Sequence, residues 1–391
     1  MKTIKSLDDL AINGAKPAFS EPLHVGHPFV GDRKVFLGYV DEILDNNWLT
    51  NNGPMVMALE KQVAEHHDVK HCVAMCSGTV ALEIAIRALK LEGEVIVPSF
   101  TFIATAHALH WQAIKPVFAD ISPDTHNLDP DSVRRMISDR TTGIIGVHLW
   151  GRTAPIEELQ AIADEHNLKL LFDSAHAFGC THNGIKVGNF GACEVLSFHA
   201  TKFFQTLEGG AVLTNDDRLA DTLRLMRNFG FSGFDNVIHP GTNGKMNEMS
   251  AAMGLTNLQY LETRIEHNRN VYHHYLHALS NIPCIKLLEY DDKETNNYQY
   301  IVIEISEDCK VSRDRLVEVL RAENILARRY FWPCCHRMRP YKSMLPAQSC
   351  SLEQSETISD RVVVLPSGVA VDKEMIDTIV TAIAVLIENS Q

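Results

Sequence analysis

The sequence predicts an α/β protein in which a large, mostly parallel sheet is followed by a smaller α+β unit. Short apolar runs alternate with helix-like stretches between residues 70 and 215, the pattern of a parallel sheet wrapped by helices. Near the C-terminal end the order becomes strand, helix, strand and helix. A chain of 391 residues also exceeds what one simple core accommodates, so we expect a large domain and a smaller one.

Each element of the expected sheet is a short apolar run with turn-forming residues beside it. The expected strands are His71–Cys76, Glu94–Pro98, Pro116–Asp120, Gly143–His148, Leu168–Asp173, Val195–Phe198 and Gly210–Thr214. The expected helices between them are Thr79–Leu91, Thr101–Gln112, Asp131–Ile137 and Ile156–Asn167. Ligands of such sheets bind beyond the carboxyl ends of the strands, so these ends are where we look for a site.

Helical patterns flank the expected sheet on both sides. Two amphipathic helices precede it, Asp32–Asn46 and Val56–Val69, and a helical pattern runs from Asn215 to Leu279. The expected elements of the C-terminal unit are the strands Gln299–Ile305 and Arg361–Leu365 and the helices Arg313–Glu323 and Asp372–Asn389. A polar, acidic bend near residues 280–295 predicts a large domain of residues 1–280 and a small domain of residues 281–391.

The composition excludes several classes of protein. Lysine and arginine number 36 against 49 acidic residues, and the net charge of −13 argues against a general nucleic-acid binder. Neither a signal peptide nor an apolar run of membrane-spanning length is present, so we expect a cytoplasmic protein without membrane contact. The nine cysteines show no C-x-x-C spacing, and we expect no metal site.

Lys202 is the most informative residue of the chain. It ends the run Ser-Phe-His-Ala-Thr-Lys, downstream of Asp173, which closes an apolar strand. Pyridoxal 5′-phosphate needs an amine that bonds with its aldehyde and an anion that keeps its ring nitrogen protonated. Alone, each residue is more simply a surface lysine or a capping acid. Together they predict a pyridoxal phosphate site.

Further residues at expected strand ends suit the same cofactor. Ser77, Gly78 and Thr79 lie between a strand and a helix, where backbone N–H groups and hydroxyls bind phosphate; the simpler alternative is an ordinary helix cap. Phe102 could stack on the pyridine ring, although any single Phe is more often part of the core. Phe100 is the weaker candidate for stacking because it lies nearer the strand.

Three more side chains, Ser197, His199 and His176, complete the expected reactive edge. Ser197, a candidate donor to the phosphate, lies in the expected strand Val195–Phe198, and His199 and Lys202 follow that strand. Lys202 would then move a proton between the two reacting carbons, with Asp173 and His199 as the other catalytic candidates. His176 could bind the ring hydroxyl or the substrate, or only support its neighbours. A lysine at 202, where a histidine would lack the amine, favours amino transfer over dehydration.

The segment from Arg328 to Tyr341 holds four arginines and two tyrosines in fourteen residues. In an acidic chain this concentration suggests anion recognition, and a pyrophosphate suits the forked geometry of arginine. We take Arg329, Tyr330 and His336 as candidate substrate residues. The alternative is a solvated basic edge that pairs with the surplus acids.

In this order and spacing the residues resemble the DegT/DnrJ/StrS family of sugar aminotransferases. The resemblance extends over most of the chain, from Trp48–Pro54 through Gly241–Glu248 to Leu365–Gly368. It implies the aspartate aminotransferase fold (fold type I), with pyridoxamine 5′-phosphate as the intermediate form of the cofactor. It also implies that Asn243 reaches the cofactor phosphate of a neighbouring subunit, and so a homodimer with shared active sites. Lys245 stands where the family has arginine, and His176 where it often has glutamine.

The resemblance further implies L-glutamate as amino donor and a nucleotide-linked keto sugar as acceptor. The segments around Asp173, Asn243 and Arg328 look most like those of enzymes that act on dTDP-4-keto-6-deoxyglucose and give dTDP-4-amino-4,6-dideoxyglucose. A 3-aminotransferase for a 3-keto sugar nucleotide and a keto-cyclitol aminotransferase are alternatives. A non-catalytic regulator of this fold is disfavoured because Asp173, His199 and Lys202 are all present.

Overall fold

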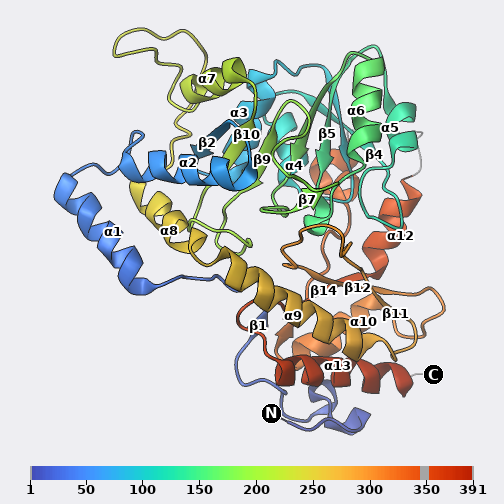
Figure 1. Cartoon of the computed structure of the whole chain (residues 1–391). Helices are drawn as coiled ribbons and strands as arrows, with labels where there is room; N and C mark the ends of the chain where they lie inside the picture. Colours follow the sequence, from blue (N-terminus) through green and yellow to red (C-terminus); the bar gives the residue numbers. More distant parts are fainter. Residues whose placement is uncertain (1, 344–351, 390–391) are drawn as a thin grey trace.

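A seven-stranded sheet forms the centre of the larger part of the molecule in the computed structural model, which describes residues 2–343 and 352–389 (Figure 1). Its strands are β2 (His71–Met75), β3 (Glu94–Pro98), β4 (Lys115–Ala119), β5 (Thr141–Val147), β6 (Lys169–Asp173), β9 (Glu194–Ser197) and β10 (Gly210–Thr214). The spatial order is β2-β10-β9-β6-β5-β3-β4, and only β10 runs antiparallel to its neighbours. All seven predicted strands, and the mostly parallel sheet, are confirmed.

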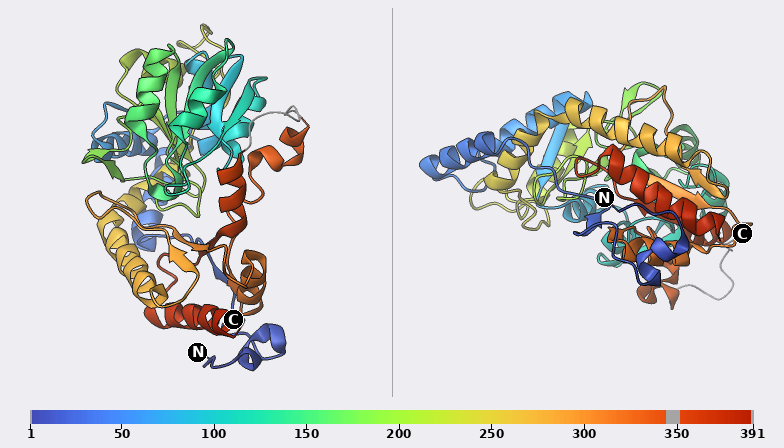
Figure 2. Two further views of the ribbon diagram at one scale, coloured as in Figure 1. Left: turned by 90° about the vertical axis from the view of Figure 1, so that its right-hand side faces the viewer. Right: turned by 90° about the horizontal axis from the view of Figure 1, so that it is seen from below.

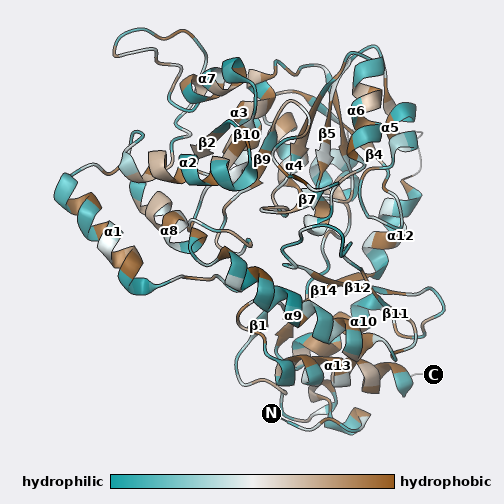
Figure 3. Cartoon of the chain, viewed as in Figure 1, coloured by the Kyte–Doolittle hydropathy of each residue, from teal (hydrophilic) through white to brown (hydrophobic). Residues whose placement is uncertain are grey.

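Helices cover both faces of this sheet. They are α2 (Pro54–His67), α3 (Gly78–Ala88), α4 (Ala104–His110), α5 (Pro130–Met136), α6 (Ile156–Glu165), α7 (Asp217–Met226) and α8 (Glu248–Leu258). Alternate strand residues enter different cores: Val73 and Met75 pack with α3, α4 and α7, whereas Cys72 and Ala74 pack with α2 and α8. The strands are apolar on both faces because both faces are covered. Figure 3 shows these hydrophobic strands enclosed by mixed helices.

A smaller three-stranded antiparallel sheet forms the second unit. Its strands are β11 (Ile285–Leu287), β12 (Ile301–Ile305) and β14 (Val362–Leu365), and it packs with α9 (Leu261–Leu279), α10 (Arg313–Ala322) and α13 (Lys373–Glu388). Figure 2 shows this unit below the large sheet, with α9 passing into it. The remaining elements are α11 (Arg339–Lys342), α12 (Glu353–Arg361), the strand pair β7 (Thr181–His182) and β8 (Ile185–Lys186), and the pair β1 (Leu23–His24) and β13 (Ile325–Leu326).

The N-terminal segment belongs to the core of this smaller unit. Leu10 and Phe19 are buried among its apolar residues, and β1 pairs in parallel with β13. The predicted division at residue 280 remains a prediction. From this packing we propose that residues 4–24 form one unit with the C-terminal part of the chain.

Residues 227–247 are the main departure from the expected elements. The pattern predicted helix from Asn215 to Leu279, but α7 ends at Met226 and α8 begins at Glu248. Between them the chain forms an extended loop that leaves the body of the molecule (Figure 1). Gly230 has φ +79°, and a Cβ on Gly241 would lie 2.5 Å from the backbone nitrogen of Gly230. Glycines in left-handed conformation or close contact interrupt the helix here.

α1 (Arg33–Asn46) projects from the body as an arm (Figure 1). Its first turn is capped by Asp32, whose carboxylate accepts from the Lys34 N–H at 2.6 Å. Only Ile43 of this helix is buried.

Among the described residues, no helix is both long enough and apolar enough to cross a membrane.

Two glycines bring the N-terminus of α3 against the edge of the large sheet. Gly210 begins β10 and pairs with Met75 and Ser197. A Cβ on Gly210 would lie 2.5 Å from the Gly78 nitrogen, and one on Gly78 would lie 2.8 Å from the Ser197 Cβ. Both distances are shorter than real Cβ contacts. The first turn of α3 therefore lies beside Ser197 only because both positions lack a side chain.

We expect Gly210→Ala to lower the stability of the protein by about 1–3 kcal/mol or more, because its methyl group would meet the backbone of Gly78. Gly38→Ala, within α1, is the matched control. No atom lies within 4 Å of a Cβ at Gly38, so alanine should stabilise the helix by about 0.5–1 kcal/mol. Urea unfolding midpoints measure both changes. A midpoint for Gly210→Ala equal to that of the wild type contradicts the steric argument.

Candidate active site

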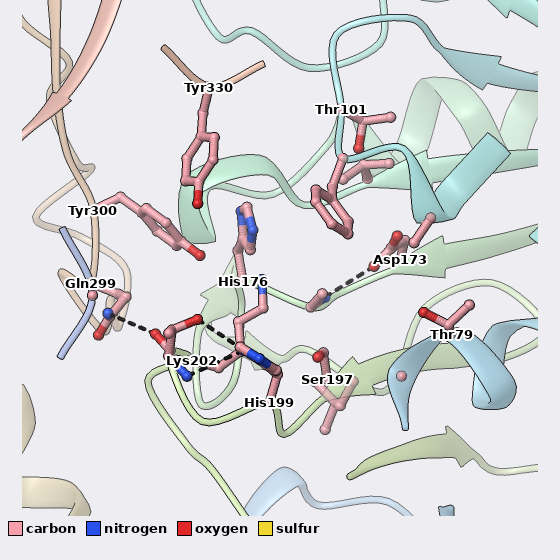
Figure 4. Close-up of a pocket in the computed structure, with 18 of the residues that line it drawn as sticks. Thr79, Thr101, Asp173, His176, Ser197, His199, Lys202, Gln299, Tyr300 and Tyr330 are labelled. Carbon is pink, nitrogen blue, oxygen red and sulfur yellow. Dashed lines mark hydrogen bonds between the residues drawn. The ribbon is translucent and has the colours of Figure 1, made fainter. Parts of the chain in front are cut away.

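A cavity of about 480 Å³ lies at the carboxyl edge of the large sheet, where the smaller unit faces it. From the sheet side it is lined by Asp173 at the end of β6, Ser197 at the end of β9 and the start of α3. Figure 4 shows these side chains around Lys202, with Tyr300 and Tyr330 opposite. The cavity therefore combines groups from both units, at the place predicted for a ligand of a parallel sheet.

Asp173 is fixed by two hydrogen bonds. The Thr105 hydroxyl donates to its Oδ2 at 2.8 Å, and the Ala175 N–H donates to its Oδ1 at 3.2 Å. Burial raises the pKa of this carboxyl group, and the bonds from Thr105 and Ala175 and the charge of Lys202 oppose that rise. The carboxylate has a fixed orientation, and it is stabilised further when a cation comes near it.

Lys202 lies in the turn after β9, where its N–H donates to the carbonyl of His199 at 2.8 Å. Burial lowers the pKa of its ammonium group to about 8, and the charge of Asp173 partly opposes this effect. A larger fraction of the side chain is therefore a neutral, nucleophilic amine near neutral pH than in an exposed lysine.

His176 is held as a neutral ring in a stack of aromatic side chains. The backbone N–H of Trp150 donates to its Nδ1 at 3.2 Å, so the proton of the neutral ring is on Nε2. Its ring centroid lies 4.4 Å from that of Tyr300 and 6.1 Å from that of Phe331. Burial, and secondarily Lys202, lowers the pKa of His176 well below its usual range. The residue therefore supplies one N–H donor to the cavity.

The first turn of α3 forms an anion cradle at the sheet edge. The Ser77 hydroxyl accepts from the Val80 N–H at 3.2 Å, so Ser77 is the N-cap that the simpler interpretation expected. The N–H groups of Gly78 and Thr79 are in the first turn, where no intrahelical acceptor exists. Together with the hydroxyls of Thr79 and Ser197, which also line the cavity, they suit a phosphate group.

The two phenylalanines near this edge have different environments. Phe100 is fully buried in an aromatic cluster with Trp150 and Phe331. Phe102 is 55% exposed and lines the cavity. Of the two, only Phe102 offers a ring face to a ligand, as the sequence analysis expected.

His199 lies at the rim of the cavity rather than in its depth. The Thr201 N–H donates to its Nδ1 at 3.3 Å, and its Nε2 lies 3.7 Å from Glu208. Its side chain is about half exposed. We retain His199 as a candidate that orients the turn carrying Lys202.

The structure brings only one of the three predicted substrate residues to the cavity. Tyr330 lines it, and the Arg328 guanidinium lies 4.8 Å from the Tyr330 ring centroid. Arg329 is not in the cavity lining, because it pairs with Asp314 at 2.9 Å. His336 is also outside the lining.

The contacts of His336 explain its position outside the cavity. Its Nδ1 contacts the Ser99 hydroxyl at 2.6 Å, and its Nε2 contacts Glu356 at 2.9 Å. Both ring nitrogens therefore have partners within the protein. The basic and aromatic composition of this segment predicted an anion site but could not distinguish these partnered residues from the ones that reach the cavity.

Gln299, Tyr300 and Arg328 are among the lining residues that the sequence did not single out as site residues. The Arg328 N–H and carbonyl bond to Val364 of β14 at 3.0 and 2.9 Å, which fixes this residue against the small sheet. Arg328 is the only arginine among the described residues that line the cavity. The cluster of arginines indicated that this segment binds an anion. Only the backbone pairing with β14 shows that Arg328 is the arginine that lines the cavity.

Asn243 lies outside the cavity, on the exposed loop of residues 227–247. Its backbone pairs with Asn228 in an isolated bridge. Within this single chain it therefore has no contact with the candidate site, as the expected role toward a neighbouring subunit requires.

The residues present fit pyridoxal 5′-phosphate. The cavity has an amine of lowered pKa, a fixed carboxylate, a neutral N–H donor, an aromatic face and an anion cradle. The close contact at Gly78 and Gly210 sets the cradle directly beside Ser197. These are the groups that the aldehyde, ring nitrogen, ring hydroxyl, ring face and phosphate need.

Comparison with known proteins gives concordant matches. Over 363 residues the chain is 35% identical to a dTDP-4-amino-4,6-dideoxy-D-glucose transaminase of Shigella dysenteriae, covering 93% of this chain and 98% of the relative. It is 32% identical to a GDP-perosamine synthase of Caulobacter vibrioides, covering 81% and 87%. The structure is similar to that of DesI in the presence of its TDP-sugar product, with a TM-score of 0.93 and 43% identity over 97% of this chain and 96% of that one.

These matches confirm the predicted fold, the aminotransferase activity and pyridoxal phosphate as the cofactor. The model of the DegT/DnrJ/EryC1/StrS aminotransferase family matches residues 32–384, nearly the whole described chain. The chain therefore belongs to the DegT/DnrJ/EryC1/StrS aminotransferase family.

Proposed function

We propose that this aminotransferase takes an amino group from L-glutamate and transfers it to dTDP-4-keto-6-deoxyglucose, giving dTDP-4-amino-4,6-dideoxyglucose. The observation that carries the chemistry is that Lys202 and Asp173 line one cavity of about 480 Å³. The similarity to the Shigella transaminase and to DesI, a protein with a TDP-sugar product, supports the choice of acceptor.

Bound pyridoxal phosphate supplies an aldehyde that takes up an amino group and a ring that withdraws electrons from the reacting carbon. Lys202 holds the cofactor through its Nζ. When its Nζ is not bonded to the cofactor, Lys202 would accept the proton from the carbon of the donor and return a proton to the carbon of the acceptor. A pKa of about 8 suits proton movement in both directions near neutral pH.

Asp173 and His176 hold the two polar edges of the ring. The Asp173 carboxylate, whose orientation is fixed by Thr105 and Ala175, would accept the N–H of the ring nitrogen and keep that proton in place. His176 would donate a hydrogen bond from Nε2 to the ring hydroxyl, because Nδ1 already accepts from the backbone of Trp150. The start of α3 and Ser197 would bind the phosphate, and Phe102 would cover one face of the ring.

Arg328 is our candidate for recognition of the acceptor's pyrophosphate. It lines the cavity from the side of the small unit, and no carboxylate within the described chain pairs with it. A guanidinium whose donors are free binds a phosphate oxyanion with forked geometry. Tyr330, beneath that guanidinium, is positioned to contact the sugar. Pyrophosphate binding distant from the reacting carbon helps to orient a small ketone.

One observation favours a second acceptor. The chain is also 32% identical to a GDP-perosamine synthase, so a GDP-linked keto sugar is the alternative for the nucleotide. A 3-keto sugar nucleotide and a keto-cyclitol remain the alternatives for the ketone. A keto-cyclitol lacks a pyrophosphate and would leave Arg328 without an anionic ligand.

We further propose a homodimer in which Asn243 contacts the cofactor phosphate of the partner subunit. Exposed apolar side chains on two segments of the chain support a surface that a second subunit covers. They include Leu37, Leu44, Trp48 and Leu49 on and after α1, and Phe229, Phe234, Val237 and Ile238 on the loop of residues 227–247. Such a concentration of exposed apolar groups is typical of a protein interface.

The lowered pKa of Lys202 predicts the pH dependence of cofactor capture. Only the neutral amine attacks the aldehyde, so the rate at which the apoenzyme binds pyridoxal phosphate should rise through pH 8 and level off above it. Stopped-flow absorbance measures this rate. The Asp173 charge raises the pKa of Lys202, so Asp173→Asn should move the midpoint below that of the wild type. A midpoint near the usual lysine pKa of about 10.4 contradicts the assignment.

The two half-reactions test the proposed substrates. Glutamate should remove the visible absorbance band of the lysine-bound cofactor, and dTDP-4-keto-6-deoxyglucose should restore it. Loss of the band without return would keep the donor and redirect the search to GDP-linked, 3-keto and cyclitol acceptors. Failure of glutamate to change the band, with bound cofactor verified, contradicts the proposed donor.

Arg328→Gln should raise the KM for the nucleotide sugar by about 10- to 100-fold, because a charge-assisted contact to phosphate is lost. The KM for glutamate should change little. Arg329→Gln is the matched control, since Arg329 already pairs with Asp314 away from the cavity. Steady-state kinetics with each substrate varied separates these effects. An increase confined to the KM for glutamate would assign Arg328 to the donor instead.

A further inference from the structure

A second cavity, of about 400 Å³, lies where the segment leading into α1 crosses the start of α9. Its lining includes Phe29, Gly31 and Asp32 of that segment and Tyr260, Arg264 and His267 of the helix region. The Asp32 carboxylate accepts from the Lys34 N–H as the cap of α1. The crossing is fixed by a bond from the Gly31 N–H to Asn257 at 3.0 Å and by an edge contact between Phe29 and Tyr260. Figure 1 shows this crossing at the foot of the α1 arm. None of these residues lines the candidate active site.

Arg264 is a buried cation without a counter-ion. The residue is only 3% exposed, and its guanidinium lies 4.6 Å from the ring centroid of Phe29 and 4.8 Å from that of Phe203. Its Nη1 donates to the carbonyl of Phe203, but its Nε is buried with no hydrogen-bond partner. Within residues 2–343 and 352–389, no carboxylate lies within 4.0 Å of the guanidinium. Burial lowers its pKa to about 10.

The other deeply buried arginines of the described chain have acidic partners. Arg227, 6% exposed, pairs with Glu60, and Arg313, 4% exposed, pairs with Asp314 at 2.7 Å. A buried charge without a partner is strongly unfavourable, and the ring contacts supply only part of the compensation. Arg264 therefore lacks the anionic partner that Arg227 and Arg313 have within the chain.

We propose that Arg264 is the receptor of an oxyanion-binding site in this second cavity, which takes a carboxylate or phosphate group. Arg264 lines the cavity and has no carboxylate partner among the described residues, and a guanidinium binds both kinds of oxyanion with forked geometry. This site is separate from the proposed substrate site. The Arg264 guanidinium also donates to the carbonyl of Phe203, the residue that follows Lys202. An oxyanion bound to Arg264 would therefore affect the position of the turn that carries Lys202.

The oxyanion has two possible sources, which share this chemistry. One is a free anion such as phosphate. The other is a carboxylate side chain of a second copy of this chain, since the cavity adjoins the α1 arm and its exposed apolar residues. Asp41, Glu42 and Asp45 are exposed on α1 and have no ion pair within the described residues. This second source rests on the proposed homodimer, whereas the site itself does not.

The experiment compares three forms of the holoenzyme: wild type, Arg264→Met and Arg269→Met. Arg269 is the matched control, because it lies on the same helix, is exposed and contacts the Tyr298 ring. The Tm of each is measured with and without sodium phosphate, at an ionic strength held constant with sodium chloride. The dimer dissociation constant of each is measured by sedimentation velocity. Bound cofactor keeps the cofactor phosphate site occupied throughout.

A free anion as the source predicts that saturating phosphate raises the Tm of the wild type and of Arg269→Met by about 2 °C or more. Arg264→Met should lose most of this rise, and any rise that it keeps reports phosphate bound at Arg328 in the active site. Its Tm without phosphate should equal or exceed that of the wild type, because the unpaired buried charge is gone. A carboxylate of a second copy as the source predicts no phosphate response. In that case Arg264→Met alone should weaken the dimer by about tenfold or more.

Two results would overturn the proposal. Arg264→Met could retain both the wild-type phosphate response and the wild-type dimer. Alternatively, it could lower the Tm equally with and without phosphate while the dimer is unchanged. The ring contacts and the bond to Phe203 would then be the whole role of Arg264.

Discussion

The electrostatic coupling of Asp173 and Lys202 is the interaction on which the site depends. Burial disfavours the charged form of both groups, raising the pKa of the carboxyl and lowering that of the ammonium. Each charge opposes the effect of burial on the other. The balance leaves Lys202 with a pKa of about 8, where the amine can both accept and release a proton. Without Asp173 the pKa of Lys202 would be lower, and without Lys202 the pKa of Asp173 would be higher.

The fold fixes the position of Asp173, one residue of this pair. Asp173 ends a central strand, and behind it Glu194 accepts hydrogen bonds from the Ser174 hydroxyl at 2.5 Å and from the N–H groups of Gly188 and Phe190. His148, fully buried, lies 3.2 Å from the same Glu194. This polar network makes the strand end rigid, whereas Lys202 lies in a turn. A fixed carboxylate and a lysine on a turn suit an amine that must bind the cofactor, leave it and return.

Much of the fold follows from the sequence because strands that are covered on both faces read as continuous apolar runs. The position of Asp173 at a strand end followed from the same signal. The loop of residues 227–247 could not be predicted in this way. Its sequence has helical periodicity, but the close contact between Gly230 and Gly241 outweighs it. Likewise the chain composition cannot show that N-terminal residues such as Leu10 join the C-terminal core, since that packing is long-range.

The candidate site was less predictable where neighbouring residues differ only in orientation. Phe100 and Phe102 were separable, because the residue nearer a strand is the more buried one. Arg328 and Arg329 were not, because their chemistry is identical and only the pairing of Arg328 with β14 turns one toward the cavity and leaves the other to Asp314. The two arginines differ in their partners: Arg329 pairs with Asp314, whereas no carboxylate among the described residues pairs with Arg328. Several arginines of this acidic chain pair with a carboxylate, as Arg227, Arg313 and Arg329 do. Lys202, Arg328 and Arg264 line cavities and have no carboxylate partner among the described residues, and we assign these three to ligands.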